Sequence, residues 1–164
     1  MLVSNGIVGS VGSVEDATGT LDFIDVPWAE AAKRLLRRRT KGGLDFALSM
    51  QHSQYLFHGA VLYNDEDHTV VVRRPEELAL IVDLSQTSSV PDIVRQAALI
   101  GHAFGNQHVP VEVDGCCILM PMLSSEDLMT KTVSDLKLGE LSLRFDRVRL
   151  GASRPLLMTG LTHE

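Results

Sequence analysis

The chain has 164 residues, of which 45% are hydrophobic and 22% charged, and its formal net charge is −6. This composition is typical of a soluble globular protein that forms one domain or two small ones, rather than of a disordered or fibrous chain. The acidic balance argues against a general binder of nucleic acid or anionic membrane, because such a protein needs a basic face.

The N-terminal sequence and the two cysteines indicate in which cellular compartment the protein is expected. The stretch MLVSNGIVGSVGS has no basic residue before its short apolar run, so we do not expect a secretory signal. No apolar run approaches the ~20 residues needed to cross a bilayer. Cys116 and Cys117 are adjacent, and neighbours in a strand point to opposite faces, so we do not expect them to bridge each other. A reduced, cytoplasmic setting is the simplest interpretation.

The first half of the chain is predicted to be rich in strands. LDFAL, residues 44–48, has a strand pattern, and AVLYN and TVVVRR flank the acidic residues 65–68 as the two strands of a hairpin. WAEAAKRLLRRR, residues 28–39, is ambiguous. Its Ala, Glu, Lys and Leu content favours a helix, whereas its position before the hairpin favours a strand, and both readings stay open.

A buried strand and a helix are predicted next. LALIVDL, residues 78–84, is a continuous apolar run suited to a buried strand. A helix then begins with Ser89 as N-cap and Pro91 in the first turn, and Gly105 is its expected stop in a left-handed conformation. Its apolar residues have helical spacing and predict one face packed on a sheet. They are Val90, Ile93, Val94, Ala97, Ala98, Gly101 and Phe104.

The remaining elements complete a β-α-β-β-α-β order. HVPVEV, residues 108–113, and CCILMPM, residues 116–122, read as strands around an Asp-Gly turn. Ser124 opens a second helix that ends near Gly139, and residues 140–150 form the last strand. This order is that of a ferredoxin-like split βαβ unit.

The predicted fold class is therefore α+β, in three parts. Residues 1–75 form an N-terminal β-rich domain with a loosely ordered, Gly- and Ser-rich start. Residues 76–150 form the ferredoxin-like domain, and residues 151–164 form a C-terminal tail.

Among six histidines, His108 has the most favourable position for a ligand, because a turn before a strand holds it near the rim of a domain. His102 complements the dipole of its helix, so a structural explanation suffices for it. His68 reads as a solvated residue of the acidic turn, and His52 and His58 carry little functional signal. From the residues alone, a structural role is favoured even for His108, because no CxxC, HxH or HExxH pattern supports a metal site.

No catalytic residues and no nucleotide-binding residues are predicted. No Ser-His-Asp or Cys-His constellation can be assembled from the spacing, and no Gly-rich phosphate-binding loop is present. One basic run is conspicuous in this acidic chain and could bind an acidic partner, although a solvated face is the commoner explanation. It consists of Lys33, Arg34, Arg37, Arg38, Arg39 and Lys41.

Three stretches together resemble a known family. PWAEAAKRLLRRRT, GAVLYNDEDHTVVVRR and GHAFGNQHVPVEVDG occur in the order and spacing seen in the UreE family of urease accessory proteins, which are nickel metallochaperones. The resemblance spans roughly residues 26–150, and GNQHVPVEV is similar to the family's Gly-Asn-x-His-x-Pro turn. It implies a ferredoxin-like metal-binding domain and an N-terminal domain like the peptide-binding part of a chaperone.

The resemblance implies that His108 is the nickel ligand, and that two copies of it, one per subunit, meet across a symmetric homodimer. Imidazole suits Ni²⁺ but also accepts Zn²⁺ and Cu²⁺. His163 in the tail is a further candidate ligand, and His102 is a weaker one. The chain lacks the histidine-rich tail of many members, so one bridging Ni²⁺ per dimer is expected rather than storage of several ions.

The leading hypothesis is a non-enzymatic, cytoplasmic metal carrier. It would pass Ni²⁺ towards the urease apoprotein assembly complex through the accessory GTPase, without binding nucleic acid or membrane. The alternative is a metal-independent assembly adaptor in urease maturation. A third reading, an RNA-binding module, is disfavoured by the acidic charge and by the lack of paired aromatic residues on the strands.

Overall fold

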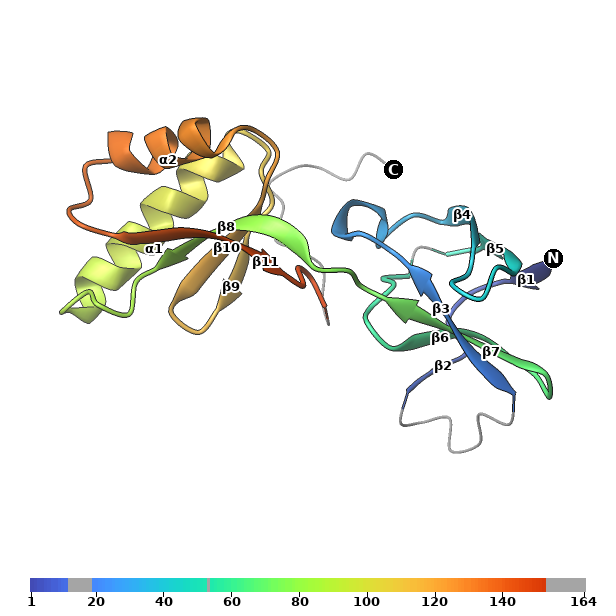
Figure 1. Cartoon of the computed structure of the whole chain (residues 1–164). Coiled ribbons are helices and arrows are strands. Elements are labelled where there is room, and N and C mark those ends of the chain that lie inside the picture. Colours follow the sequence, from blue (N-terminus) through green and yellow to red (C-terminus); the bar gives the residue numbers. More distant parts are fainter. Residues whose placement is uncertain (12–18, 53, 153–164) are drawn as a thin grey trace. The chain divides into compact units, whose positions relative to one another are not determined.

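The structure is a computed structural model that describes residues 1–11, 19–52 and 54–152 (Figure 1). The chain divides into two compact units. The N-terminal unit comprises Met1–Pro75 together with residues 151 and 152, and the C-terminal unit comprises Glu76–Leu150. Within the described residues, no helix is long and apolar enough to span a membrane.

The N-terminal unit consists of two small sheets. The first has the order β1-β5-β4, from β1 (Leu2–Ser4), β4 (Leu35–Arg39) and β5 (Asp45–Ser49). The second has the order β2-β6-β7-β3, from β2 (Gly9–Ser10), β3 (Thr20–Asp25), β6 (Ala60–Asn64) and β7 (His68–Arg73). The hairpin of β6 and β7 confirms the prediction made from the acidic turn.

The ambiguous segment 28–39 divides into a short 3₁₀ turn, Trp28–Glu30, and the strand β4. Residues 35–39 form a strand despite their helix-favouring composition, because all five pair with the antiparallel strand β5, with Leu36 opposite Leu48. Leu36 is buried while its neighbours along the strand are exposed, which is the alternation of a half-buried strand.

A buried arginine joins the last described residues to the N-terminal unit. Arg74 is fully buried, and its Nη1 donates to the hydroxyl of Tyr55 (2.8 Å) and to the carbonyl of Gly151 (2.9 Å). The guanidinium also lies over the Tyr55 ring at 5.6 Å. The backbone N–H of His58 donates to the carbonyl of Ala152 (2.7 Å). Residues 151 and 152 follow the C-terminal unit in the sequence, but these hydrogen bonds hold them in the N-terminal unit.

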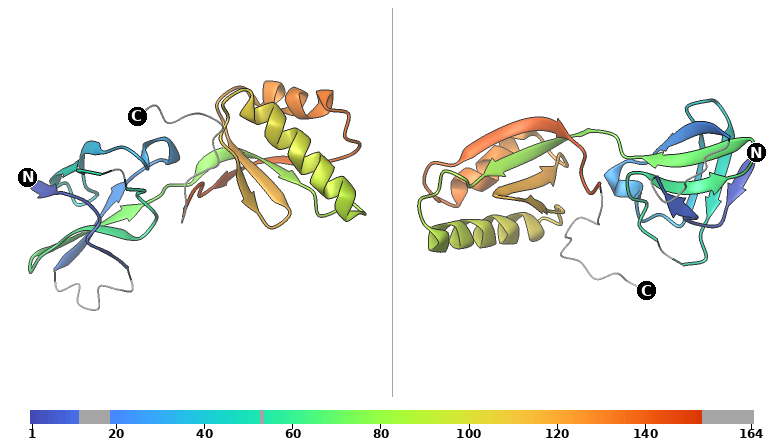
Figure 2. Two further views of the ribbon diagram at one scale, coloured as in Figure 1. Left: turned by 180° about the vertical axis from the view of Figure 1, so that it is seen from behind. Right: turned by 90° about the horizontal axis from the view of Figure 1, so that it is seen from below.

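The C-terminal unit is one antiparallel sheet with two helices. The order is β11-β8-β10-β9, from β8 (Glu77–Asp83), β9 (Glu112–Asp114), β10 (Cys117–Pro121) and β11 (Ser142–Val148). Helix α1 (Val90–Gly105) follows β8, and α2 (Glu126–Asp135) follows β10. Both helices lie against the same face of the sheet (Figure 2), where Ile100 and Met129 share a core with Leu80 and Met120.

The start of α1 agrees with the prediction, and two later boundaries do not. Ser89 caps α1 by accepting from the N–H of Asp92. For α2 the cap is Ser125, which accepts from the N–H of Leu128, because Ser124 lies one residue too early. The expected strand 108–113 begins only at Glu112, since residues 106–108 continue as turn after α1.

The predicted apolar face of α1 is wider than the sheet can cover. Ile100 and Phe104 are buried, as expected, but Val90 is 72% exposed and Val94 62% exposed. A sheet touches one side of a cylinder, so residues at the margin of a broad apolar stripe stay in solvent. Val90 and Val94 thus leave an exposed apolar strip along α1.

Candidate metal centre

His108 lies in the turn that follows α1. The N–H of His108 donates to the carbonyl of Gly105 (2.9 Å), and the N–H of Val109 donates to that of Phe104 (3.0 Å). This pair of bonds is the Schellman pattern, which closes a helix on a residue in left-handed conformation. Phe104 and Val109 are both buried in the same core, as that motif favours.

The left-handed residue is His108 itself, with φ of 57°, and not Gly105 as expected. Gly105 is the last residue of α1 and is buried. The expectation was wrong because the helix closes three residues later, where Phe104 and Val109 meet in the core. A non-glycine residue in this region costs of the order of 1 kcal/mol, and such strain is concentrated at functional sites.

The side chain of His108 is exposed, while the next two residues, Val109 and Pro110, are buried. The buried pair fixes the backbone, so the imidazole is presented to solvent from a rigid turn. The position also lies beyond the C-terminal end of α1, where the helix dipole favours a cation. A protein-bound metal ion would gain from both features.

His102 is also exposed, on the last turns of α1. Its Nε2 lies 3.1 Å from Nδ2 of Asn106, four residues further along. That contact engages the ring nitrogen that would otherwise face solvent, which supports the structural reading of His102. His163 lies outside the described residues.

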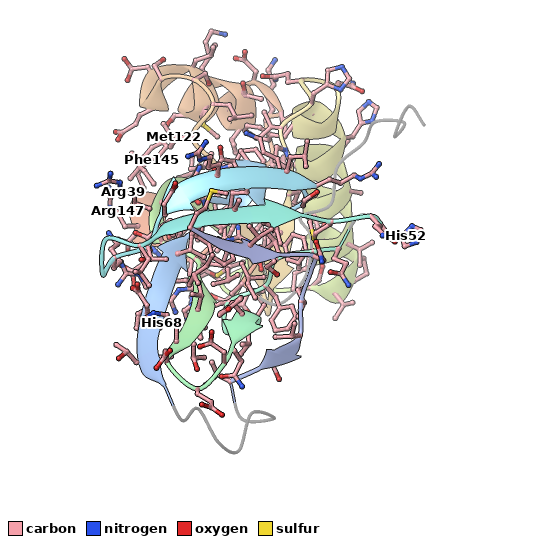
Figure 3. All side chains as sticks on the ribbon, turned by 90° about the vertical axis from the view of Figure 1, so that its right-hand side faces the viewer. Arg39, His52, His68, Met122, Phe145 and Arg147 are labelled. Atoms are coloured by element: carbon pink, nitrogen blue, oxygen red, sulfur yellow. The ribbon has the colours of Figure 1, made fainter. Side chains whose placement is uncertain are left out.

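The other three histidines belong to the N-terminal unit. His52 projects from the loop after β5 (Figure 3), and His58 accepts the backbone N–H of Arg74 through Nδ1 (3.1 Å). His68 was expected in the acidic turn as a solvated residue, but it is the first residue of β7 and is half-buried. The turn is shorter than expected because Asp65 accepts the backbone N–H groups of Asp67 and His68.

Among residues 1–11, 19–52 and 54–152, no group of three or more His, Cys, Asp or Glu side chains is placed to hold a metal ion. Within these ranges, His108 is therefore not part of a group of three or more such side chains that could hold an ion. Cys116 is exposed in the turn before β10 rather than in a strand, and Cys117 is half-buried at the start of β10. Both are free thiols.

An apolar groove of about 270 Å³ borders the His108 turn. Its lining is Ala97, Gly101, Gly105, Val109, Val111, Val113 and Ile118. A Cβ added at Gly101 would meet nothing within 4 Å, so this part of α1 faces open space. Val90 and Val94 precede Gly101 at helical spacing and extend the exposed apolar strip along α1.

The groove was not predicted from the sequence. One signal was available in the four-residue spacing of Gly101 and Gly105, because two small residues on one helix face permit close approach by another element. The left-handed turn had only a weak signal, since glycine is the residue that this conformation favours most, although histidine is enriched there among the other residues.

Comparison with known proteins gives one consistent family. Residues 6–74 match the family model described as the UreE urease accessory protein, N-terminal domain. A urease accessory protein UreE of Bacillus cereus is 28% identical over 135 residues, which cover 79% of this chain and 84% of that protein. One of Yersinia aldovae is 30% identical over 130 residues, covering 77% of this chain and 56% of that protein.

A third relative, from Halalkalibacterium halodurans, carries the same description and is 28% identical over 110 residues, 67% of this chain and 68% of that protein. The matching lengths exceed the 75 residues before the second unit, so the likeness extends beyond the N-terminal unit. The chain belongs to the UreE family of urease accessory proteins, which are not enzymes.

Proposed function

We propose that this protein is a nickel metallochaperone that binds Ni²⁺ through His108 at the interface of a homodimer and delivers it for assembly of the urease metallocentre. One observation carries the proposal: an exposed imidazole on a rigid, left-handed turn at the end of α1. Membership of a urease accessory family supplies the biological setting.

The chemistry of one imidazole per chain suits a carrier. Neutral imidazole is a good ligand for Ni²⁺, and Zn²⁺ or Cu²⁺ would also bind in vitro. A site with two protein nitrogens and open positions releases its ion more readily than a closed cage of four ligands. Ni²⁺ is the cargo here, so an open site is an advantage. His163 is proposed as an additional ligand from the tail, with His102 as a weaker candidate.

A second copy of the chain is the proposed occupant of the groove beside His108. One histidine cannot complete a metal site, and a two-fold axis near this turn would bring its twin opposite it. The apolar lining supports this choice, because Val109 borders the groove directly after His108. The exposed strip of Val90 and Val94 would continue the same contact along α1.

The two units fit separate parts of this role. The β-α-β-β-α-β order of the C-terminal unit supports a ferredoxin-like metal-binding domain at residues 76–150. Residues 1–75 would form the domain that resembles the peptide-binding part of a chaperone, followed after residue 150 by the tail. The accessory GTPase and the urease apoprotein complex are the proposed partners, and the cytoplasm is the proposed compartment.

Calorimetric titration with Ni²⁺ tests the ligand. In His108→Ala, binding should be lost or weakened by about 100-fold or more, because the only histidine of the turn is removed. His52→Ala is the matched control, since that imidazole is exposed in the N-terminal unit, and it should bind like the unaltered protein. Binding should also weaken as pH falls through the histidine range.

Deletion of residues 160–164 tests the tail. If His163 is a ligand, the truncated chain should bind Ni²⁺ more weakly while remaining a dimer. An unchanged isotherm would remove His163 from the site. An unchanged isotherm in His108→Ala would instead favour the metal-independent adaptor.

Analytical ultracentrifugation of Gly101→Leu tests the groove. The monomer should tolerate the added side chain, because the Cβ position is open, whereas an interface would be overpacked by about 1–3 kcal/mol. Dimer dissociation should therefore become about 5- to 150-fold easier. Arg95→Leu puts the same side chain on an exposed position of α1 away from the groove and should leave the dimer intact. Equal dimerisation by both variants would contradict this interface.

A further inference from the structure

Strand β4 is the outer strand of its sheet. In the order β1-β5-β4 it pairs with β5 alone (Figure 3), and it carries part of the basic run noted in the sequence. The metal site lies in the other unit and makes no use of this strand. The edge is closed beyond the strand, where the N–H of Lys41 donates to the carbonyl of Phe23 (2.8 Å), but from Leu35 to Arg39 it can receive another strand.

The register shows which backbone groups face that edge. The N–H of Met50 donates to the carbonyl of Arg34 (2.9 Å), and the N–H of Thr40 donates to that of Leu44 (2.8 Å). Even-numbered residues of this segment therefore bond to β5, and Leu35, Arg37 and Arg39 turn their N–H and C=O groups outwards. These outward groups have no hydrogen-bond partner within the part of the chain that the structure describes.

The same three residues have exposed side chains. Leu35 is 71% exposed, the Arg37 side chain is 71% exposed, and Arg39 is exposed at the end of the strand (Figure 3). Leu36 and Arg38 point to the other face. One face of this open edge thus presents an apolar residue followed by two cations at alternate positions.

Most other cations of the run are already engaged within the N-terminal unit. Lys33 and Arg38 both pair with Glu30, and Lys41 pairs with Asp25. These pairs lie beside the 3₁₀ turn and the end of β3.

Arg37 and Arg39 differ from them. Arg37 pairs with Asp45 (2.9 Å), but both side chains are exposed, and such surface pairs contribute little and exchange readily. Arg39 has no ion-pair or hydrogen-bond partner among the described side chains. Within the described part of the chain, the open edge therefore carries one cation without an ion pair, Arg39, and one whose pair with Asp45 is exposed, Arg37.

We propose that β4 docks an extended acidic segment of a partner protein as an added strand. Main-chain hydrogen bonds to Leu35, Arg37 and Arg39 would supply affinity, and side chains at alternate positions would supply specificity. Residues opposite each other on paired strands share a face, so the segment carries carboxylates opposite both arginines and an apolar side chain opposite Leu35. This docking is independent of the metal site.

Edge arginines can also serve only to prevent self-association of sheets. An edge built for that purpose alone would not expose a leucine on the same face. The exposure of Leu35 beside two alternating cations favours a binding edge.

Fluorescence anisotropy with the full chain and a labelled peptide of about eight residues tests the proposal. The probe has one valine and two carboxylates at alternate positions, and its control has the same composition with the carboxylates adjacent. The alternating peptide should bind at least about tenfold more tightly, because adjacent carboxylates fall on opposite faces. Raising the salt concentration should weaken its binding.

Protein variants locate the site. Arg37→Glu combined with Arg39→Glu should weaken binding of the alternating peptide by about tenfold or more. Arg144→Glu combined with Arg147→Glu makes the same charge change at exposed positions of β11 and should have no effect. If the double variant misfolds, N-methylated peptides test the docking with the unaltered protein. Methyl groups on the alternate amides that face β4 should abolish binding, and methyl groups on the amides that face away should not.

Three results would overturn the proposal. They are equal binding of both peptides, unchanged binding by the double charge reversal, and indifference to the position of N-methylation. Binding of duplex DNA or anionic vesicles through Arg37 and Arg39 without binding of the peptide would also overturn it, by assigning the edge to another class of ligand.

Discussion

The two units of this chain use polar and apolar residues in opposite ways. Five of the six ion pairs among the described residues lie in the N-terminal unit. That unit also holds most of the buried polar or charged residues within the described part of the chain, including Asp22 and Arg74, whereas the C-terminal unit buries Gln96. The C-terminal unit instead exposes apolar side chains along α1, with Val90 and Val94 mostly in solvent.

The difference shows that conspicuous residues are a poor guide to function. The basic run dominates the sequence of the N-terminal unit, yet three of its six members, Lys33, Arg38 and Lys41, form ion pairs with Glu30 and Asp25 within that unit. In the C-terminal unit the proposed dimer surface is made mainly of glycine, alanine and valine, which attract no attention in a sequence. Spectroscopy can follow the units separately, because Trp28 is the only tryptophan and both α-helices of the described chain are in the C-terminal unit.

The largest expected effect is on the N-terminal unit. Arg74→Met should lower its free energy of unfolding by about 2–4 kcal/mol, because a buried guanidinium that bonds Tyr55 and Gly151 is lost. Denaturant unfolding followed by Trp28 fluorescence measures this change. Helical circular dichroism should show little change in the C-terminal unit.

The matched control is Arg34→Met. Arg34 also donates to backbone carbonyls, those of Met50 and Gln51, but it is exposed, so its removal should cost well under 1 kcal/mol. Equal losses in the two variants would show that the burial of Arg74 is not what makes it important.

A smaller effect, of opposite sign, is expected in the C-terminal unit. His108→Gly should raise its free energy of unfolding by roughly 0.5–1 kcal/mol, since glycine adopts a positive φ without strain but loses more chain entropy. Lys137, with φ of 52°, follows α2 in the same conformation, so Lys137→Gly should give a similar gain. Helical circular dichroism during urea unfolding measures both.

Nickel binding separates these two variants. It should be lost in His108→Gly and retained in Lys137→Gly, because only the first removes an imidazole. Retention of binding in both would mean that the strained histidine is not the ligand. Loss of binding in both would mean that the loss in His108→Gly does not report on the imidazole.

The smallest expected effect is on how the stability of the N-terminal unit changes as the pH falls. Hydrogen bonds from Arg73, opposed by partial burial and aided by Lys41, hold the pKa of Asp25 below its usual value. A carboxyl group with a lowered pKa stabilises the fold above its unfolded-state pKa of about 3.9, and this stability is lost as pH falls below that value. Asp25→Asn should therefore flatten the decline in stability between about pH 4 and pH 2 measured by Trp28 fluorescence. An equally steep decline in the variant would assign the acid sensitivity to other carboxyl groups.

Sequence patterns predicted the elements that depend on neighbours along the chain. Ser89 could be identified as a cap because its partner Asp92 is three residues away. The strand nature of residues 35–39 could not be decided, because it depends on β5, and the left-handed turn at His108 depends on core contacts of Phe104 and Val109. His108 was singled out with the help of a family resemblance, and its role as ligand stays a prediction. The groove beside it could not be predicted, because α1 and residues 109–118 form it together.

The bonds from Tyr55 and Arg74 to Gly151 have a consequence for biosynthesis. On the ribosome, residues 1–75 emerge first, but the segment that closes their unit emerges only after the whole of the second unit has been made. The C-terminal unit, whose residues are contiguous, can fold while the earlier unit still lacks its last contacts. The first part of the chain to be synthesised is therefore expected to be the last to reach its final stability.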